Sequence, residues 1–194
     1  MSAMTAPEFW FSQDRMLTVD DMEDMPDDEF RYELDDGVLV VSPAPSNLHQ
    51  LAVTRLTMLL SGACPDDLLV LAGPGINLGR FQHRVPDVAV IRWTSFREPF
   101  PEDPPVLAVE VASPRTRVYD RNRKKDVYEE FGVASYWIFE PDEVRPDLTV
   151  FELRRGRYAQ VAQVTGDTPY HAVRPFPVSV VPAALVARPP APAP

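Results

Sequence analysis

The sequence predicts a mixed α/β fold in which a central, curved sheet is flanked by helices. Segments with the composition of strands lie on both sides of two helical stretches, which is typical of a layered α/β domain. One of these segments, residues 106–111, is apolar on both faces, as expected for a central strand that is covered from both sides. The longer helix, expected over residues 47–62, should cover one face of the sheet.

Length and composition predict a single domain. The chain has 194 residues, of which 45% are apolar, and this is enough for one substantial core. We expect the domain to span residues 17–185, after an N-terminal extension, 1–16, and before a Pro- and Ala-rich tail, 186–194, in which residues 188–194 cannot pack. The single cysteine, Cys64, excludes an intramolecular disulfide framework.

Charge and hydropathy argue against a membrane protein, a secreted protein and a non-specific nucleic-acid binder. No apolar run approaches the roughly 20 residues that span a bilayer, and residues 1–10 do not resemble a signal peptide, so we expect a cytoplasmic protein without membrane contact. The net charge of −10 argues against tight, non-specific binding to nucleic acid. The charge is uneven, however, because residues 115–125 contain six basic side chains and one acid, Asp120. A local basic patch is therefore expected.

Capping and turn residues predict the first helix and the first pair of strands. Thr18 is the predicted N-cap of a short helix that runs to about Met25, with aspartates suited to the positive N-terminal end. Strands 30–34 and 38–42 should form an antiparallel hairpin, because a glycine-containing turn separates them.

The remaining elements are marked by caps, breaks and periodicity. Ser46 can cap the helix over 47–62, in which apolar residues recur at helical spacing. A basic helix over 121–131 should end at Gly132, which suits the position after a helix C-terminus. The expected strands are a second hairpin of 67–72 with 75–78, then 84–91, 106–111, 135–140, 148–153 and 157–164.

Glu110 is the most informative single residue. Side chains alternate along an extended strand, so Val106, Ala108 and Glu110 share one face of 106–111. An acid thus points into an apolar layer, where an unpaired carboxylate costs several kcal/mol. It needs a metal, a basic side chain or a set of hydrogen-bond donors as its partner. A structural ion pair near the strand end is the alternative to a functional role.

Asp87 and Lys124 complete a pattern with Glu110. Asp87 follows a proline and precedes an apolar run, a position where aspartate also has an ordinary role in turns. Lys124 lies on the apolar stripe of its helix, whereas Lys125 falls on the flank with Glu129. We therefore expect Lys124 to point inward and Lys125 outward, unless Lys124 extends its ammonium group from the edge of the stripe.

Other candidate residues give weaker signals. Alternation places Glu33 on the same face as Arg31 and Asp35, which predicts a solvent-facing acid. His49, near the start of the long helix, is expected to be a surface or half-buried histidine. The sequence has no HxH, HExxH or CxxC spacing for zinc, and no GxSxG, GxxxxGK[ST] or GxGxxG motif. Serine hydrolases, P-loop enzymes and dinucleotide-binding domains are not supported.

The chain resembles a bacterial family of putative restriction endonucleases within the PD-(D/E)XK nuclease superfamily. The resemblance runs from about residue 17 to residue 153 and keeps order and spacing. It is carried by residues 32–37, Ser42-Pro43, His49-Gln50, 85–88, 109–114, Thr116, 119–121, Lys124, Gly132-Val133 and Tyr136-Trp137.

The resemblance implies a restriction-endonuclease-like fold and a magnesium-dependent phosphodiesterase site. By position, Asp87 is similar to the first metal ligand, Glu110 to the second acid, and Glu33 to an acid from the N-terminal region. One departure is that the superfamily signature has a lysine two residues after the second acid, where this chain has Ala112. The small Ala112 leaves room for Lys124, and the family pattern also places its lysine at this helix position.

Two functions follow as hypotheses. The first is a DNA endonuclease that depends on Mg²⁺ or Mn²⁺ held by Asp87 and Glu110, with Lys124 and Glu33 at the catalytic site. We expect it to act as a homodimer, because cleavage of both strands is easiest with two sites related by two-fold symmetry. The alternative is a non-catalytic binding module that keeps the fold. Phosphate contacts are predicted for Arg115, Arg117, Arg121 and Arg123.

Overall fold

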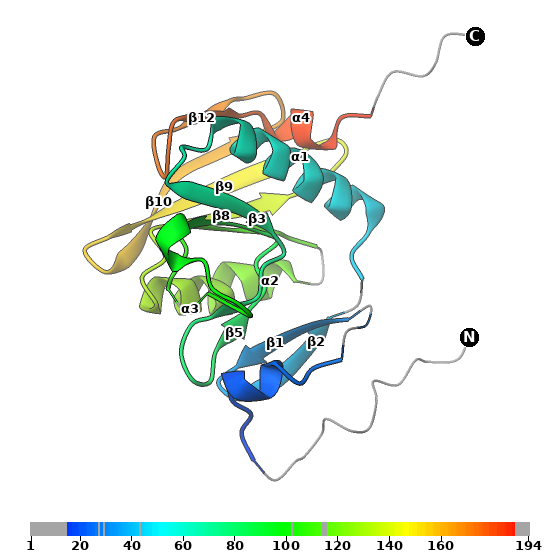
Figure 1. The fold of residues 1–194 in the computed structure, drawn as a ribbon. Coiled ribbons are helices and arrows are strands. Elements are labelled where there is room, and N and C mark those ends of the chain that lie inside the picture. Colours follow the sequence, from blue (N-terminus) through cyan, green and yellow to red (C-terminus); the bar gives the residue numbers. More distant parts are fainter. Residues whose placement is uncertain are drawn as a thin grey trace, which may run out of the picture.

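The structure of the protein is a computed structural model that describes residues 15–188, except 27, 29, 43, 102, 114 and 115. Two main sheets form the body of the described chain, with helices on both faces of the larger one (Figure 1). The predicted mixed α/β fold is confirmed.

The larger sheet has six strands in the order β10-β9-β8-β7-β6-β3. Strands β7 and β8 are parallel and every other neighbouring pair is antiparallel. Strand β7, which holds Glu110, lies between two partners and is buried along its whole length, as its apolar sequence predicts. The strands are β3 (Leu68–Ala72), β6 (Val88–Arg92), β7 (Leu107–Val111), β8 (Ser135–Glu140), β9 (Asp147–Arg154) and β10 (Arg157–Thr165).

The smaller sheet has the order β2-β1-β5-β4. Its strands are β1 (Arg31–Asp35), β2 (Val38–Ser42), β4 (Ile76–Asn77) and β5 (His83–Arg84). The expected β1/β2 hairpin is confirmed. Two other expectations are wrong: β3 pairs with β6 and β4 pairs with β5, and residues 84–91 form parts of two strands. Gly73, with a φ of 61°, turns the chain out of the larger sheet, and Pro86 cannot donate a ladder hydrogen bond.

Helix α1 (Asn47–Ala63) covers one face of the larger sheet. The Ser46 side chain accepts a hydrogen bond from the backbone N–H of His49, which confirms the predicted cap. Ala52, Leu56 and Leu60 pack against apolar side chains of β6 to β9. The same core is closed by helix α4 (Pro182–Val186) and by the hairpin of β11 (Tyr170–Ala172) with β12 (Val178–Val180).

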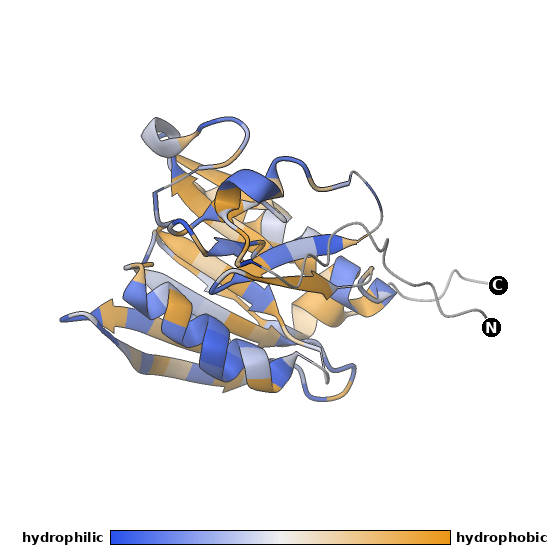
Figure 2. Ribbon diagram, turned by 90° about the horizontal axis from the view of Figure 1, so that it is seen from below, coloured by the Kyte–Doolittle hydropathy of each residue, from blue (hydrophilic) through white to orange (hydrophobic). Residues whose placement is uncertain are grey.

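The opposite face of the larger sheet is covered by the segment between β7 and β8. It consists of α2 (Arg117–Tyr119), a π-helical turn (Asp120–Lys124) and α3 (Lys125–Glu130), so it begins before the expected basic helix. Val127 and Tyr128 pack on small and apolar side chains of the sheet. Figure 2 shows many hydrophobic residues in the strands of the larger sheet, beside helices with one hydrophilic side.

Two short 3₁₀ helices complete the architecture, η2 (Val19–Met22) and η3 (Trp93–Ser95). Helix η2 is shorter than the predicted helix, and the backbone N–H and hydroxyl of Thr18 both donate to Asp21. Among the described residues, no helix combines the length and apolar character that crossing a bilayer requires.

Candidate active site

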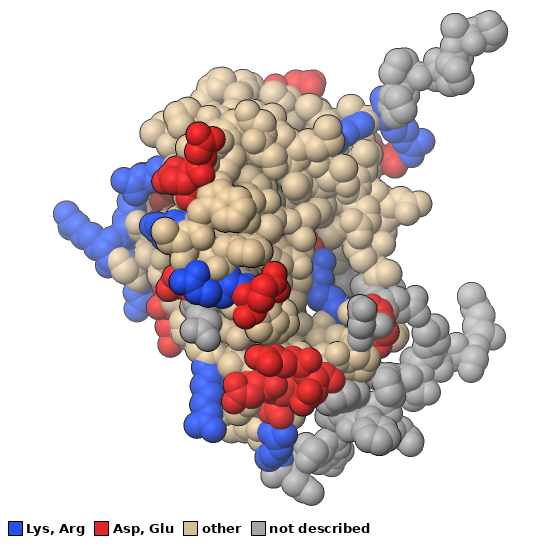
Figure 3. Space-filling view, in the orientation of Figure 1, with Lys and Arg blue, Asp and Glu red and all other residues tan. Residues whose placement is uncertain are grey.

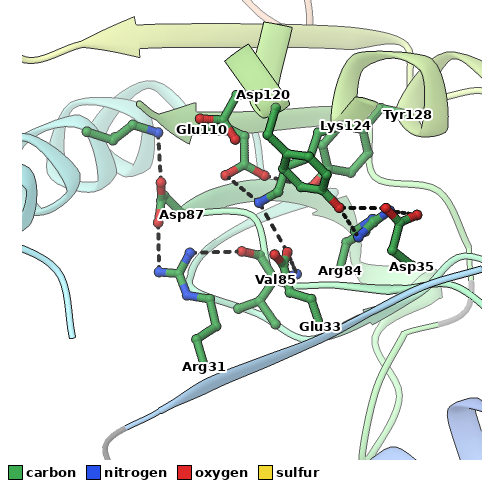
Figure 4. Close-up of polar contacts among 12 residues, drawn as sticks. Arg31, Glu33, Asp35, Arg84, Val85, Asp87, Glu110, Asp120, Lys124 and Tyr128 are labelled. Atoms are coloured by element: carbon green, nitrogen blue, oxygen red, sulfur yellow. Dashed lines mark hydrogen bonds and ion pairs between the residues drawn. The ribbon is translucent and has the colours of Figure 1, made fainter. Parts of the chain in front are cut away.

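Three buried, charged side chains meet where β1 of the smaller sheet, β7 of the larger sheet and the π-helical turn approach one another (Figure 4). Glu33, Glu110 and Lys124 are 3%, 2% and 5% exposed. The Nζ atom of Lys124 lies 3.1 Å from Oε1 of Glu33 and 3.1 Å from Oε2 of Glu110. The inward orientation that the sequence predicts for Glu110 and Lys124 is therefore observed. The solvent-facing position predicted for Glu33 is wrong.

Local structure explains how these groups meet. Ala108 on β7 and Ala112 directly after β7 belong to the core cluster under α3, the side to which Glu110 also points, and their small side chains leave space for Lys124. On the helical segment, Asp120 and Lys124 are the first and last residues of the π-helical turn, and both are buried. Wide turns of this kind occur frequently at functional sites.

The pKa values of the glutamates shift in opposite directions. Burial raises the pKa of Glu110 well above its ordinary value, and the charges of Asp87, Asp120 and Glu33 raise it further, against the opposing effect of Lys124. Burial also disfavours ionisation of Glu33, but the charge of Lys124 and the backbone N–H of Val85, at 2.9 Å, lower its pKa. One lysine thus keeps one of two buried carboxyl groups ionised. The hydroxyl of Tyr128 donates to Glu110 at 2.9 Å.

Lys124 stays protonated at this position. Burial alone would lower its pKa, but the nearby carboxylates, with Glu110 and Glu33 first among them, raise it above the ordinary value for lysine. The group is therefore a permanent positive charge between acids.

Asp87 lies beside this group with partners of its own. Its Oδ1 accepts a hydrogen bond from Arg31 at 2.7 Å, and its Oδ2 accepts one from the backbone N–H of Val111 at 2.7 Å and lies 3.1 Å from Nε2 of His49. Burial opposes ionisation of Asp87, but the contact with His49 and the charge of Arg31 hold its pKa well below the ordinary value. Asp87 is thus an anion, in contrast to Glu110.

Three residues at the site were not predicted from the sequence. His49 was expected to be a surface or half-buried histidine, yet it lies on the buried stripe of α1 with Ala52 and Leu56. Its helical spacing from these two residues could have indicated this position. Asp120 stands four residues before Lys124 and is 2% exposed, and burial raises its pKa. Arg31 reaches Asp87 from β1 across 56 positions of sequence, for which no local signal exists.

Comparison with known proteins identifies the family. The model of the Uma2 family, described as "Putative restriction endonuclease", matches residues 19–184. The chain belongs to this family. Among solved structures, it is similar to a putative nuclease belonging to DUF820 from Anabaena variabilis ATCC 29413, with a TM-score of 0.67 and 18% identity over 88% of this chain and 97% of the other. No curated protein matches the chain.

The arginines predicted to contact phosphate are mostly engaged in this Uma2 family member. Arg121 donates to Glu140 at 2.6 Å, and Arg123 donates to Asp35 at 2.7 Å. Arg117 has a more exposed side chain, 56%, and a longer contact of 3.6 Å with Glu140. Arg115 lies outside the described residues. Figure 3 shows Lys and Arg side chains along the side where α3 and the β9/β10 hairpin lie, and acidic side chains over the smaller sheet and η2.

A second polar cluster lies next to the first in this family member. Asp35 accepts hydrogen bonds from Arg84 at 2.5 Å, from Arg123 at 2.7 Å and from the hydroxyl of Tyr119 at 2.7 Å. Arg84 is fully buried. Burial disfavours ionisation of Asp35, but these three donors lower its pKa far below the ordinary value. The cluster ties the smaller sheet to the helical segment that carries Lys124.

The chemistry of the acidic residues fits a hard divalent cation. The basic residues around Glu33, Asp87, Glu110 and Asp120 are Lys124, Arg31, His49 and Arg84, and Arg84 is also bound to Asp35. Burial, with the charges of the neighbouring acids, nevertheless raises the pKa of Glu110 above its ordinary value. Within the described part of the chain, no three His, Cys, Asp or Glu side chains converge as a ready-made metal cage. Mg²⁺ is commonly held by one or two carboxylates together with substrate phosphates, so these two observations are compatible.

Proposed function

We propose that the protein is a DNA endonuclease that hydrolyses phosphodiester bonds with the help of Mg²⁺ or Mn²⁺. The observation that carries the proposal is the excess of buried acids around one lysine, in a chain of the Uma2 family. Structural ion pairs are normally balanced, whereas a site for a cation and a phosphate has more acids than its own basic residues can neutralise.

Asp87 and Glu110 are the proposed ligands of the metal ion. When bound, the ion lowers the pKa of the attacking water and polarises the phosphate. Asp87 is already ionised, with its carboxylate oriented by the N–H of Val111. Glu110 would hold the ion in its ionised form, and the hydroxyl of Tyr128 donates a hydrogen bond to its Oε1.

Lys124 is proposed to stabilise negative charge on the phosphate. Its raised pKa makes it a poor general base at neutral pH, which favours the electrostatic role over proton abstraction. Glu33 is proposed to position Lys124, because the two side chains form an ion pair of 3.1 Å. The backbone N–H of Val85 donates a hydrogen bond that holds the Glu33 carboxylate in place.

A homodimer is the proposed assembly for cleavage of duplex DNA. Each chain offers one such site among its described residues, and two sites related by two-fold symmetry would cut both strands. Light scattering over a range of protein concentrations tests this, and a monomeric mass at high concentration with double-strand cleavage would contradict it.

Cleavage of supercoiled plasmid tests the activity. Wild-type protein should nick or linearise the plasmid with Mg²⁺ or Mn²⁺ and lose this activity in EDTA. Asp87→Asn and Glu110→Gln should each lower the cleavage rate by at least about a hundredfold, because each removes a proposed metal ligand. Asp36→Asn is the matched control, since the Asp36 side chain is 70% exposed.

The alternative function has a distinct outcome. A non-catalytic binding module would bind DNA without cutting it, and its binding would not depend on Mg²⁺ or on Asp87 and Glu110. Wild-type protein that binds an oligonucleotide but leaves plasmid intact with both metals would favour this alternative and overturn the proposal.

A further inference from the structure

A pocket of about 540 Å³ opens beside the candidate active site, between η2, the start of β1 and the turn that contains Gly75. This volume lies within the range of about 300–1,000 Å³ found for small-molecule pockets. Arg31 and Val85 line it, and the same two residues reach the acids of the site. Arg31 donates to Asp87 at 2.7 Å, and the N–H of Val85 donates to Glu33 at 2.9 Å.

Aromatic residues form part of the pocket wall, together with Met22, Met25 and Pro26. Phe30, Tyr32, His83 and Phe100 line it, and the rings of His83 and Phe100 meet edge to face with centroids 4.7 Å apart. Gly75 permits this arrangement, because a Cβ atom there would lie 2.7 Å from the Phe100 ring. Phe30 and Phe100 are partly buried, pack against the apolar cluster of the smaller sheet, and line the pocket.

Charge differs between the two ends of the pocket. Arg31 stands at the end next to Asp87, with a side chain that is 27% exposed. A guanidinium group has five N–H donors, and the contacts to Asp87 and to the carbonyl of Val85 engage two of its nitrogens, Nη2 and Nη1. Donors therefore remain for a phosphate oxygen. Glu23, an exposed acid, lines the pocket at η2 and can accept hydrogen bonds from the amino group of a base.

We propose that this pocket binds one unstacked nucleotide of a DNA strand, next to the phosphate that is cut. Arg31 contacts a phosphate of that nucleotide, and the rings of Phe30 and Phe100 receive its base. The inference rests on the proposed function, which places the reacting phosphate at Asp87 and Glu110.

The subsite implies a preference for single-stranded or distorted DNA. A base can enter the pocket only after it leaves the duplex stack. The acidic side chains over the smaller sheet and η2 (Figure 3) also repel the two backbones of a duplex more than the one backbone of a single strand. Stacking on aromatic rings tolerates any base, so this subsite does not by itself select a sequence.

Photocrosslinking tests the location. The probe is a single-stranded oligonucleotide with 5-iodo-2′-deoxyuridine at successive positions, bound to the full chain in EDTA so that no strand is cut. The expected crosslinked residues, found by mass spectrometry, are Phe30, Tyr32, His83 or Phe100. Crosslinks confined to other aromatic residues, such as Trp93 and Phe96, would overturn the inference.

Binding measurements with matched variants test the energetics. Phe30→Leu and Phe100→Leu keep apolar volume but remove the aromatic face, and each should raise the Kd for the oligonucleotide about tenfold. Phe96→Leu is the control, because Phe96 is 38% exposed and contacts Trp93 away from the pocket. Thermal unfolding verifies that the variants are folded. Equal effects of all three substitutions would contradict the subsite.

The two proposals fail in different ways. Plasmid cleavage by wild-type protein without crosslinks in the pocket overturns the subsite and leaves the endonuclease standing. Crosslinks in the pocket without cleavage support the subsite and favour the non-catalytic binding module. Absence of both binding and cleavage overturns both proposals.

Discussion

The Lys124 cluster, made of Lys124, Glu33 and Glu110, and the Asp35 cluster, made of Asp35, Arg84, Arg123 and Tyr119, are built from the same pieces of chain. Both join β1 to the helical segment after β7. On β1 the two acids, Glu33 and Asp35, are two residues apart, and on the helical segment the two basic residues, Arg123 and Lys124, are adjacent. In the Asp35 cluster one carboxylate is surrounded by donors. In the Lys124 cluster one ammonium group is surrounded by carboxyl groups.

This difference distinguishes a structural contact from the candidate active site. The pKa of Asp35 falls far below its ordinary value, so its charge is stable within its set of donors. The pKa of Glu110 rises, because burial and nearby acids leave its charge unsatisfied. A group whose ionised form needs another positive charge is suited to bind a cation, whereas a fully paired group stabilises the fold.

The largest expected effect is on catalysis by Lys124→Ala. The substitution removes the only ammonium group between Glu33 and Glu110, and plasmid cleavage per folded molecule should fall by about three orders of magnitude. Lys125→Ala should change cleavage less than about twofold, because Lys125 lies over the Phe151 ring, 5.7 Å from its centroid, away from both acids. Small and equal effects at the two positions would remove Lys124 from the mechanism.

The next effect is on stability, and it belongs to the Asp35 cluster. Asp35→Asn leaves the fully buried Arg84 without its anionic partner and should lower the free energy of unfolding by roughly 3 kcal/mol, measured by urea denaturation. Asp36→Asn is the control, because Asp36 is exposed and asparagine tolerates its φ of 50°. Comparable stability of the two variants would contradict the structural role.

The sequence predicted those parts of the site that depend on local periodicity. Alternation along residues 106–111 indicated the inward orientation of Glu110, and helical spacing indicated that of Lys124. The same method gave the wrong environment for Glu33, because the larger sheet and its helix cover the face of β1 that alternation assigned to solvent. Periodicity reports which side chains share a face, but it does not report what covers that face.

The remaining parts depend on contacts between distant segments. Arg31 and Asp87 are 56 positions apart, and Arg123 and Asp35 are 88 positions apart. Strand pairing was also missed where a few residues divide the chain between two sheets, as at Gly73. Glu129, which shares a flank of the helix with Lys125, forms its ion pair at 2.8 Å with Arg157 of β10. Such pairings follow from the assembled fold.

A smaller effect concerns the pH dependence of the smaller sheet, on which both clusters depend. Burial lowers the pKa of His83 from 6.5 to about 4, so the folded state holds this histidine neutral while the unfolded chain takes up a proton. The stability that neutral, buried His83 contributes is therefore fully present above pH 6.5, and it is lost as the pH falls toward 4.

Denaturation at several pH values measures this effect. Between pH 6.5 and 4.5 the raised pKa of Glu110 acts on stability in the opposite direction, so the prediction concerns the difference between two proteins: relative to His83→Gln, wild-type protein should lose about 1 kcal/mol more unfolding free energy per pH unit. His83→Gln should lose less over the same interval. An identical slope in both proteins would show that His83 is not the group responsible.

The smallest expected effect is on DNA affinity at the edge of the site. Arg117→Ala should weaken DNA binding a few-fold and reduce the slope of log Kd against log salt concentration by about one, because Arg117 has an exposed side chain and only a long ion pair. Arg154→Ala is the control, with an exposed side chain on the β9/β10 hairpin. An unchanged salt slope in Arg117→Ala would place the DNA backbone elsewhere.

The magnesium-dependent shift in melting temperature tests the distinction between the two clusters most directly. Binding to the folded state alone raises the melting temperature by an amount that grows with the logarithm of ligand concentration divided by Kd. Asp35→Asn should melt at a lower temperature than wild type but keep the full magnesium response, whereas Asp87→Asn and Glu110→Gln should lose that response. A response that survives in Asp87→Asn and Glu110→Gln, or that disappears in Asp35→Asn, would contradict the assignment of the cation to the acids around Lys124.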